Sequence, residues 1–213
     1  MIDIKNFNYF DFKEFFQMKR NTPPLILASS SPRRKELLQE AGYTFIVTTP
    51  DVDEEAFTEA NLTPKKHAEQ LALAKADSIA KDCPDALIIG ADTVVDLNGR
   101  MIGKPKDVDD ARNILKKLSY SIHHVITGLA LICVSSDIKI IRSESTTIYP
   151  RKMTEGQIDK VIKSGLWRDK SGACSIEDFG EFVEKIEGSV TNVMGLPMEL
   201  LEELLINVNL PAN

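Results

Sequence analysis

Three serines, a proline and two arginines lie together in the stretch LILASSSPRRKELLQEAG, which covers residues 25–42. The apolar run Leu25–Ala28 predicts the end of a buried strand, and Ser31 followed by Pro32 is typical of a helix start. Such a turn directs hydroxyls, free backbone N–H groups and arginine side chains to one place. We therefore predict an anion site here, with polyphosphate as the obvious ligand. A capped surface helix with two solvated arginines fits the spacing equally well.

Carboxylates that could hold a cation follow two further apolar runs. Asp53 and Glu54 belong to the acidic loop 50–55, and Asp92 comes just past the end of an expected buried strand at 86–90. In α/β sheets, ligands bind at the carboxyl ends of the strands. Carboxylates from two such loops suit Mg²⁺, a hard cation that prefers oxygen ligands and keeps several waters. The plain alternative is a loop whose acidic side chains are only solvated.

Two lysines could join Arg33 and Arg34 around a polyphosphate. Lys75 falls on an expected helix, and Lys104 stands in a Gly-Lys-Pro sequence. Each lysine alone is equally well explained as a surface side chain, since most lysines lie at the surface.

Other common site motifs are absent from the sequence. The stretch 99–104 is not a Walker A loop, because its glycine spacing is one residue short and proline replaces Ser/Thr. There is no GxGxxG motif. His67, His123 and His124 lack the spacing of a zinc site, and no nucleophile–base pair stands out. We expect His123 and His124 to lie at strand edges or to form hydrogen bonds.

The elements that position these residues alternate between strands and helices. Asn98 and Gly99 have the turn chemistry of a type I′ hairpin, and Thr154 begins a capping box. Apolar runs predict strands at 25–28, 44–48, 86–90, 94–97, 124–134, 139–149, 173–176 and 182–186. Cap and stop signals predict helices at 31–42, 63–80, 107–118 and 154–165 and one that starts at Pro197. This interleaving indicates the α/β class with a mixed sheet.

Composition narrows the function classes. The chain of 213 residues is long enough for one α/β domain or two small lobes. A net charge of −6 argues against a nucleic-acid partner, which would favour a basic face. No apolar run approaches the roughly 18–20 residues of a membrane span. Three cysteines without C-x-x-C spacing suggest reduced thiols and a cytoplasmic location.

Seven short motifs, in this order, closely resemble those of the Maf family of nucleotide pyrophosphatases. They are Ser29–Arg34, Asp51–Glu54, Gly90–Thr93, Gly103–Pro105, His124–Gly128, Asp169–Ala173 and Gly195–Pro197. Any one of them is weak, but the ordered set is highly specific. The resemblance divides the chain into a Phe-rich N-terminal arm and linker (1–24), a Maf-like domain (25–207) and a tail (208–213).

The resemblance implies a two-lobed, mixed-sheet α/β fold with a central nucleotide cleft, often as a homodimer. It also implies Mg²⁺-dependent hydrolysis of a nucleoside triphosphate to a monophosphate and pyrophosphate. By position, Asp92 is the expected proton acceptor, and Asp53, Glu54 and Asp92 are the expected metal ligands. The expected phosphate-binding residues are Ser29, Arg33, Arg34, Lys75 and Lys104.

Base specificity is divided between two family types. Arg33 and Thr93 resemble the enzymes for dTTP and UTP, whereas Glu177 resembles the 7-methyl-GTP type, which carries glutamate where the others carry glutamine. A carboxylate only accepts hydrogen bonds, while glutamine donates and accepts. Because two of these three positions match the dTTP and UTP type, we expect dTTP and UTP as substrates, with some activity on modified nucleotides. The alternative substrate is 7-methyl-GTP.

A non-catalytic nucleotide-binding regulator of cell division is the competing class. A binding protein needs the arginines and lysines but has no use for Asp92 or metal-binding acids. The presence of both sets favours the enzyme.

Overall fold

The computed structural model describes residues 23–58, 62–168, 170–173 and 180–208. Along this part of the chain, the helices and strands are β1 Leu25–Ala28, α2 Pro32–Glu40, β2 Ile46–Thr48, α3 Glu55–Thr58, α4 Pro64–Ala80, β3 Leu87–Leu97, β4 Arg100–Ile102, α5 Val108–Ser119, β5 His123–Cys133, β6 Ile138–Pro150, α6 Glu155–Ser164, η2 Ser171–Ala173, η3 Gly180–Phe182, β7 Val183–Glu187, α8 Val190–Val193 and α9 Met198–Asn207. None of the described helices combines the length and apolar character that a membrane crossing needs. The predicted arm at 1–24 falls almost wholly outside these residues.

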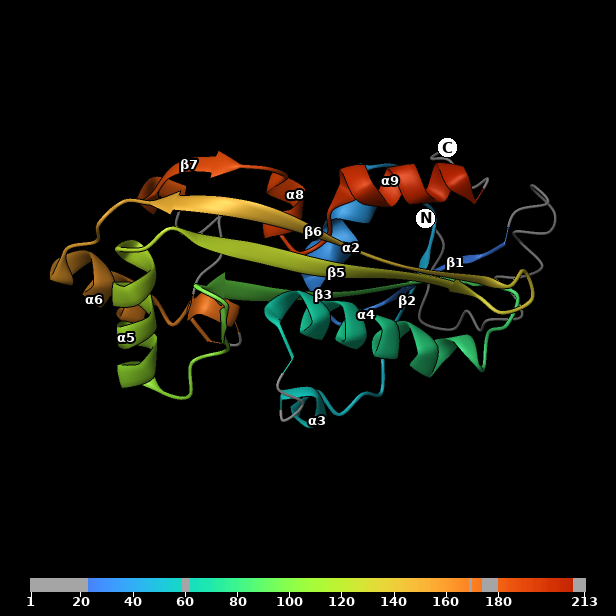
Figure 1. The fold of residues 1–213 in the computed structure, drawn as a ribbon, viewed down its shortest axis with the longest axis horizontal. Helices are drawn as coiled ribbons and strands as arrows, with labels where there is room; N and C mark the ends of the chain where they lie inside the picture. Colours follow the sequence, from blue (N-terminus) through green and yellow to red (C-terminus); the bar gives the residue numbers. More distant parts are fainter. Residues whose placement is uncertain (1–22, 59–61, 169, 174–179, 209–213) are drawn as a thin grey trace.

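A seven-stranded mixed sheet runs through the whole molecule (Figure 1). Its strand order is β2-β1-β3-β5-β6-β7, and β4 pairs with the far end of β3. Strands β2, β1 and β3 are parallel, while the pairs formed by β3, β5, β6 and β7 beyond them are antiparallel. The long strands β3, β5 and β6 therefore link a parallel end of the sheet to an antiparallel end.

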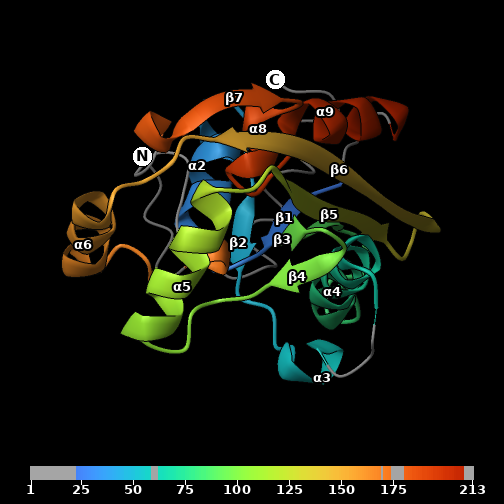
Figure 2. The same cartoon turned by 60° about the vertical axis from the view of Figure 1, so that its left-hand side comes forward.

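Helices cover the two ends of the sheet differently, which produces two lobes. At the parallel end, α4 covers one face, and α2 and α9 cover the other (Figure 1). At the opposite end, α5 and α6 pack with the ends of β3, β5 and β6 around a separate apolar cluster (Figure 2). The predicted two-lobed α/β architecture is confirmed.

Two glycines bring α4 unusually close to the sheet. A Cβ atom at Gly90 on β3 would overlap the carbonyl oxygen of Ala72, and one at Gly128 on β5 would overlap that of Ala68. Both helix residues are fully buried alanines. Small residues on both sides thus allow the backbone of α4 to lie directly on β3 and β5.

The structure corrects the prediction that Asp92 follows the end of a strand. Instead of strands at 86–90 and 94–97, β3 is continuous from Leu87 to Leu97, and Asp92 lies inside it, paired with Gly128. The strand accommodates the polar side chains of Asp92 and Thr93 because Lys75 binds the Asp92 carboxylate and Thr127 binds the Thr93 hydroxyl.

Most local signals are confirmed. Asn98 and Gly99 have φ values of 55° and 79°, as a type I′ turn requires, and the capping box at Thr154 is formed. Ser31 stands at the N-cap of α2, but its hydroxyl makes no capping bond, and its backbone N–H donates to Ser29 Oγ instead. The strand predicted at 173–176 is wrong at Ala173, which belongs to a 3-10 helix with φ of 61°. The rest of that segment lies outside the described residues.

Candidate active site

A cleft of about 1350 Å³ lies between the two lobes. Its walls are formed by the start of α2, the acidic loop before α3, one side of α4, the middle of β3 and the N-terminal start of β5. Ser29, Arg33, Arg34, Asp53, Glu54, Lys75, Asp92, Thr93 and Lys104 all line it, so the cleft brings together every predicted site residue that the structure describes. Glu177 lies outside the described residues.

The cleft forms at an interruption in strand pairing along β3. Strand β1 pairs with β3 as far as Gly90, and β4 begins its pairing at Val95. Within the described part of the chain, residues 91–94 thus have no neighbouring strand on this edge. Side chains from both faces of β3 therefore reach one cavity, which explains how Asp92 and Thr93, on opposite faces, line the same cleft.

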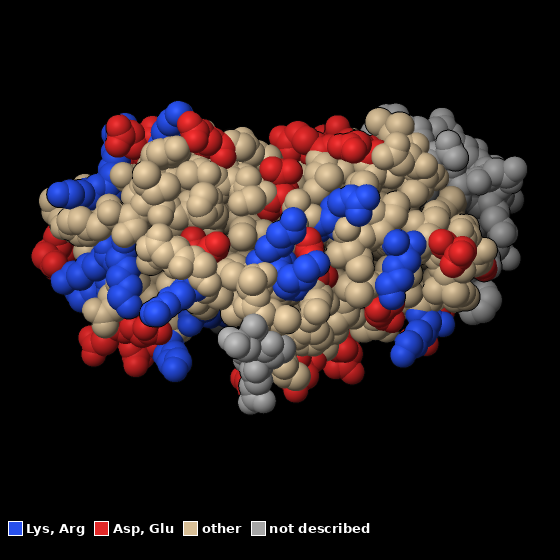
Figure 3. Space-filling model, in the orientation of Figure 1, with Lys and Arg blue, Asp and Glu red and all other residues tan. Residues whose placement is uncertain are grey.

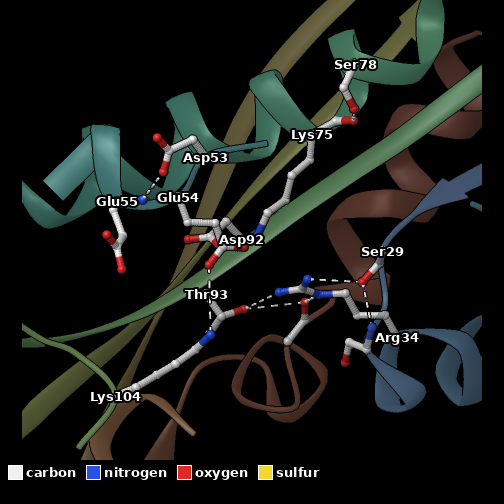
Figure 4. Close-up of polar contacts among 12 residues, drawn as sticks. Ser29, Arg34, Asp53, Glu54, Glu55, Lys75, Ser78, Asp92, Thr93 and Lys104 are labelled. Atoms are coloured by element: carbon white, nitrogen blue, oxygen red, sulfur yellow. Dashed lines mark hydrogen bonds and ion pairs between the residues drawn. The ribbon is translucent and has the colours of Figure 1, made fainter. Parts of the chain in front are cut away.

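Lys75 joins the two central carboxylates. Its Nζ atom lies 2.7 Å from Asp92 Oδ1 and 2.8 Å from Glu54 Oε1 (Figure 4). The Lys75 and Asp92 side chains are only 9% and 12% exposed, whereas Glu54 is 47% exposed. Lys75 reaches Asp92 because α4 lies so close to β3. Lys75 and Asp92 therefore form a buried ion pair, and the more exposed Glu54 binds Lys75 on the side that faces solvent.

The charges around Glu54 determine its protonation. Burial by itself raises the pKa of Glu54, but the hydrogen bond and charge of Lys75 outweigh this effect. The charges of Lys104 and Arg34 act in the same direction, so the pKa of Glu54 lies below its ordinary value. Lys104 Nζ lies 3.9 Å from Glu54 Oε2 and approaches from the opposite side of the cleft from Lys75 (Figure 4). Glu54 is therefore an ionised carboxylate at neutral pH.

Arg34 is buried and connects four segments of the chain. Its Nε donates to the Gly195 carbonyl at 2.7 Å, its Nη1 to Ser29 Oγ at 3.3 Å and its Nη2 to Thr93 Oγ1 at 3.1 Å. Burial lowers the pKa of Arg34, an effect that the charges of Asp92 and Glu54 oppose, and a guanidinium stays protonated in any case. A guanidinium has five N–H groups. Arg34 thus positions the turn after β1 and keeps N–H groups for an anion in the cleft.

A chain of hydroxyls continues from Arg34 into the protein. Thr127 Oγ1 donates to the Asn192 carbonyl at 3.0 Å and lies 2.9 Å from Thr93 Oγ1. Thr93 therefore donates to Thr127 and accepts from Arg34. Asn192 in turn donates from Nδ2 to the Val125 carbonyl and to Thr146 Oγ1, both at 2.9 Å. Thr127 and Gly195 belong to motifs that carry the family resemblance, but the sequence alone does not indicate that they hold the site together.

The remaining predicted residues are placed less centrally. Asp53 lies apart from Asp92 and accepts a hydrogen bond from the Glu55 backbone N–H at 3.1 Å (Figure 4). Arg33 is half exposed and pairs with Glu36 at 3.1 Å. No group of three or more His, Cys, Asp or Glu side chains converges within the described residues. Asp92 and Glu54 are the two carboxylates that meet in the cleft, and both bind Lys75.

The face of the molecule shown in Figure 3 has no single sign of charge, because basic and acidic side chains are interspersed on it. The cations that could attract an anionic ligand are instead concentrated inside the cleft, at Arg33, Arg34, Lys75 and Lys104. A few focused cations can bind a polyphosphate in a protein whose net charge is −6.

Comparison with known proteins places this site in context. The family model described as Maf-like protein matches residues 24–208. The dTTP/UTP pyrophosphatase of Alkaliphilus metalliredigens is 46% identical over 183 residues, which are 85% of this chain and 94% of that protein. The dTTP/UTP pyrophosphatase of Pyrococcus furiosus is 42% identical over 85% of this chain and 93% of its own length. Among solved structures, a HAM1 protein from Coxiella burnetii matches 87% of this chain and 100% of its own, with 13% identity and a TM-score of 0.44.

Proposed function

Because the chain belongs to the Maf-like protein family, we propose that it is a pyrophosphatase that hydrolyses dTTP and UTP. Water attacks the α-phosphorus, the bond from that phosphorus to the α,β-bridging oxygen breaks, and the products are the nucleoside monophosphate and pyrophosphate. The observation that carries the proposal is the buried Lys75–Asp92 pair beside Ser29 and Arg34 in the cleft. It combines a proton acceptor with cations that suit a polyphosphate.

Asp92 is the residue we assign to the attacking water. Of the described residues, Lys75 alone bonds to its carboxylate, and it does so through Oδ1. The second oxygen is therefore available to orient a water molecule and accept its proton. The rigid middle of β3 holds this carboxylate at the unpaired edge of the strand, where substrate has access.

The cations stabilise the charge that develops on the phosphates. Ser29 lies directly after β1 and Arg34 lies in the first turn of α2, while Lys75 and Lys104 approach from α4 and from the loop after β4. Phosphoryl-transfer enzymes act mainly by positioning and by electrostatic stabilisation. We propose that Lys75 shares its three N–H groups between Asp92 and a phosphate oxygen when the substrate is bound.

The donor set in the cleft fits Mg²⁺. Magnesium is usually held by one or two carboxylates, several waters and the substrate's own phosphates. Asp92 and Glu54 supply two carboxylates that meet at one cation, Lys75. When bound, Mg²⁺ would neutralise phosphate charge and polarise the α-phosphoryl group. Asp53 is the neighbouring carboxylate in the sequence and would join only after the acidic loop rearranged.

Two further parts of the proposal concern assembly and location. The two described cysteines, Cys83 and Cys133, are free thiols, which suits a cytoplasmic enzyme. A homodimer is the expected assembly, and sedimentation of the purified chain measures it directly.

The alternative substrate is 7-methyl-GTP, which only Glu177 favours. A carboxylate suits the N–H donors and the positive charge of a 7-methylated guanine. If Glu177 reads the base, Glu177→Gln raises the ratio of kcat/KM for UTP to that for 7-methyl-GTP by ~10-fold, the effect of one exchanged hydrogen bond. An unchanged ratio would exclude this role.

The decisive experiment follows pyrophosphate release from dTTP, UTP, CTP, ATP, GTP and 7-methyl-GTP, with Mg²⁺ and with a chelator. Hydrolysis in ¹⁸O-labelled water identifies the phosphorus that is attacked. We expect the label in the nucleoside monophosphate, and label in pyrophosphate would overturn the mechanism. Tight nucleotide binding without turnover in any arm would instead favour the non-catalytic regulator.

A further inference from the structure

The cleft continues beyond the phosphate end along one face of β5. Residues 123, 125 and 127 alternate onto the same face of that strand, the face on which Thr127 meets Thr93. Around this part of the cleft the lining is mostly apolar, with Leu118, Val125, Ile148 and Met153. An apolar chamber next to a polyphosphate site is suited to a flat aromatic group such as a nucleobase.

His123 is a polar residue in this apolar chamber. It lines the cleft, its exposed fraction is only 8%, and its Nδ1 atom lies 2.9 Å from the Ser121 carbonyl oxygen. A carbonyl oxygen only accepts hydrogen bonds, so Nδ1 must carry the proton. In a neutral ring, Nε2 is then an acceptor. No described residue donates a hydrogen bond to that atom.

The neutral form of the ring is favoured by its surroundings. Burial lowers the pKa of His123, the hydrogen bond to Ser121 opposes this effect, and the neighbouring His124 adds to it. The ring is therefore neutral at pH 7, with a single acceptor facing an apolar cavity. Among the described residues, the one fully buried side-chain N or O atom without a hydrogen-bond partner is Asn192 Oδ1, so Nε2 of His123 keeps contact with the cleft. A ligand N–H in the cleft can therefore reach this acceptor.

The distance along β5 matches the length of a nucleotide. Thr93, which binds Arg34, pairs with Thr127, and His123 lies four residues further along the strand. At about 3.3 Å per residue, this separation is about 13 Å. A nucleotide spans a comparable distance from its phosphates to the far edge of its base. A triphosphate held at Arg34 thus places its base at the level of His123.

We propose that His123 is a specificity-determining residue whose Nε2 accepts a hydrogen bond from a ring N–H of the substrate base. This inference rests on the proposed function. Uracil and thymine carry such a hydrogen at N3, and guanine carries one at N1. Cytosine at N3 and adenine at N1 present a lone pair, which would face the lone pair of Nε2. His123 thereby discriminates in favour of UTP and dTTP over CTP, but it does not discriminate between these nucleotides and guanine nucleotides.

A histidine that is only part of the core makes a different prediction. Its replacement would lower stability and affect all nucleotides equally, while a base-reading acceptor changes the ratio between bases. The chain offers a matched control in His124, which points to the opposite face of β5 and bonds to Thr147. His124→Gln should leave the ratio between bases unchanged.

The first test uses the unmodified protein with UTP, CTP and 3-methyl-UTP, in which a methyl group replaces the N3 hydrogen. We expect kcat/KM for both CTP and 3-methyl-UTP to be at least ~10-fold below that for UTP, since a site built for an N–H donor rejects analogues without one. If the protein hydrolyses 3-methyl-UTP as well as UTP, the proposal is overturned. This arm does not depend on the folding of any variant.

The second test compares His123→Leu with His123→Gln. Leucine removes the acceptor, so the UTP/CTP ratio should fall about 10-fold, and the UTP/3-methyl-UTP ratio should fall with it. Glutamine can still accept a hydrogen bond and should retain part of both ratios. Equal losses on all three nucleotides in His123→Leu would reveal a structural role only and would contradict the proposal.

The third test separates this inference from the proposed reaction. Binding of the non-cleavable analogues α,β-imido-UTP and α,β-imido-CTP is measured by calorimetry for the unmodified protein and for His123→Leu. Selective binding of the UTP analogue that is lost in the variant supports base reading even if UTP is not hydrolysed. Equal affinity for the two analogues in the unmodified protein would overturn it even if UTP is a substrate.

Discussion

The Nζ atom of Lys75 lies 2.7 Å from Asp92 Oδ1, and both side chains are almost completely buried. Removing two charges from water is costly, and a buried ion pair rarely stabilises a fold more than apolar residues of the same size would. This contact also requires glycine at positions 90 and 128, because a Cβ atom at either position would keep α4 away from the strands. A pair kept at such a cost is best explained by the chemistry that it performs.

Asp92→Asn should nearly abolish turnover while nucleotide binding stays measurable. Asparagine keeps the shape of the side chain but loses its charge and basicity, and general-base assistance is typically worth ~10²–10⁴-fold in rate. The measurements are kcat with UTP and the dissociation constant of α,β-imido-UTP. Asp96→Asn is the control, since Asp96 lies on the same strand and only accepts from the Gly99 N–H in the hairpin. Turnover near the wild-type level in Asp92→Asn would remove Asp92 from the mechanism.

Lys75→Met should destabilise the protein at neutral pH by up to about 3 kcal/mol, because Asp92 is left buried without a partner. Neutralising Asp92 as well should recover much of this loss. The double variant Lys75→Met/Asp92→Asn is therefore expected to be more stable than Lys75→Met alone. Urea denaturation measures both values, with the exposed Lys81→Met as the control. Strictly additive effects would show that the two side chains do not interact energetically.

Gly128→Ala should lower both stability and activity. A methyl group at this position overlaps the carbonyl oxygen of Ala68, so α4 must move away from the sheet and take Lys75 with it. Overpacking of this kind typically costs about 1–3 kcal/mol. Gly156→Ala is the matched control, since it lies on α6 with open space around it and gains helix propensity. A Gly128→Ala protein with wild-type kcat would show that the spacing between α4 and β5 is not critical.

Local signals were sufficient for most of the fold. The cap at Thr63, the capping box at Thr154 and the hairpin turn at Asn98 are each specified within a few residues, and each is formed. The continuous strand β3 could not be predicted in this way. Asp92 and Thr93 are tolerated inside it only because Lys75 and Thr127, distant in sequence, satisfy them.

The site shows the same division between local and tertiary information. The order of the motifs identified residues that line the cleft, including Ser29, Arg34 and Lys104. Their contacts were not predictable, since Arg34 binds a carbonyl 161 residues away, at Gly195. The tautomer of His123 likewise depends on the Ser121 carbonyl, whereas the sequence predicted only a strand-edge or hydrogen-bonding residue at this position.

Glu199 stabilises the segment that presents Gly195 to Arg34, and it provides a test by pH. Its Oε2 accepts from Thr191 Oγ1 at 2.6 Å and from Ser189 Oγ at 2.7 Å. The bond from Thr191 lowers the pKa of Glu199, burial opposes it, and the bond from Ser189 lowers it further. A folded-state pKa below the unfolded value of about 4.3 means that the ionised carboxylate stabilises the fold above that pH.

Glu199→Gln should therefore lower Tm at pH 7 but have little effect at acid pH. The stabilisation is fully present above pH ~4.3 and is lost as the pH falls through the lower, folded-state pKa, where the wild-type side chain also becomes neutral. Glutamine keeps an acceptor for the two hydroxyls, so the comparison isolates the charge. Glu203→Gln, an exposed position on the same helix α9, is the control and should change Tm little at either pH. A Tm difference between wild type and Glu199→Gln that stays constant from pH 7 to pH 3 would show that the charge of Glu199 contributes nothing.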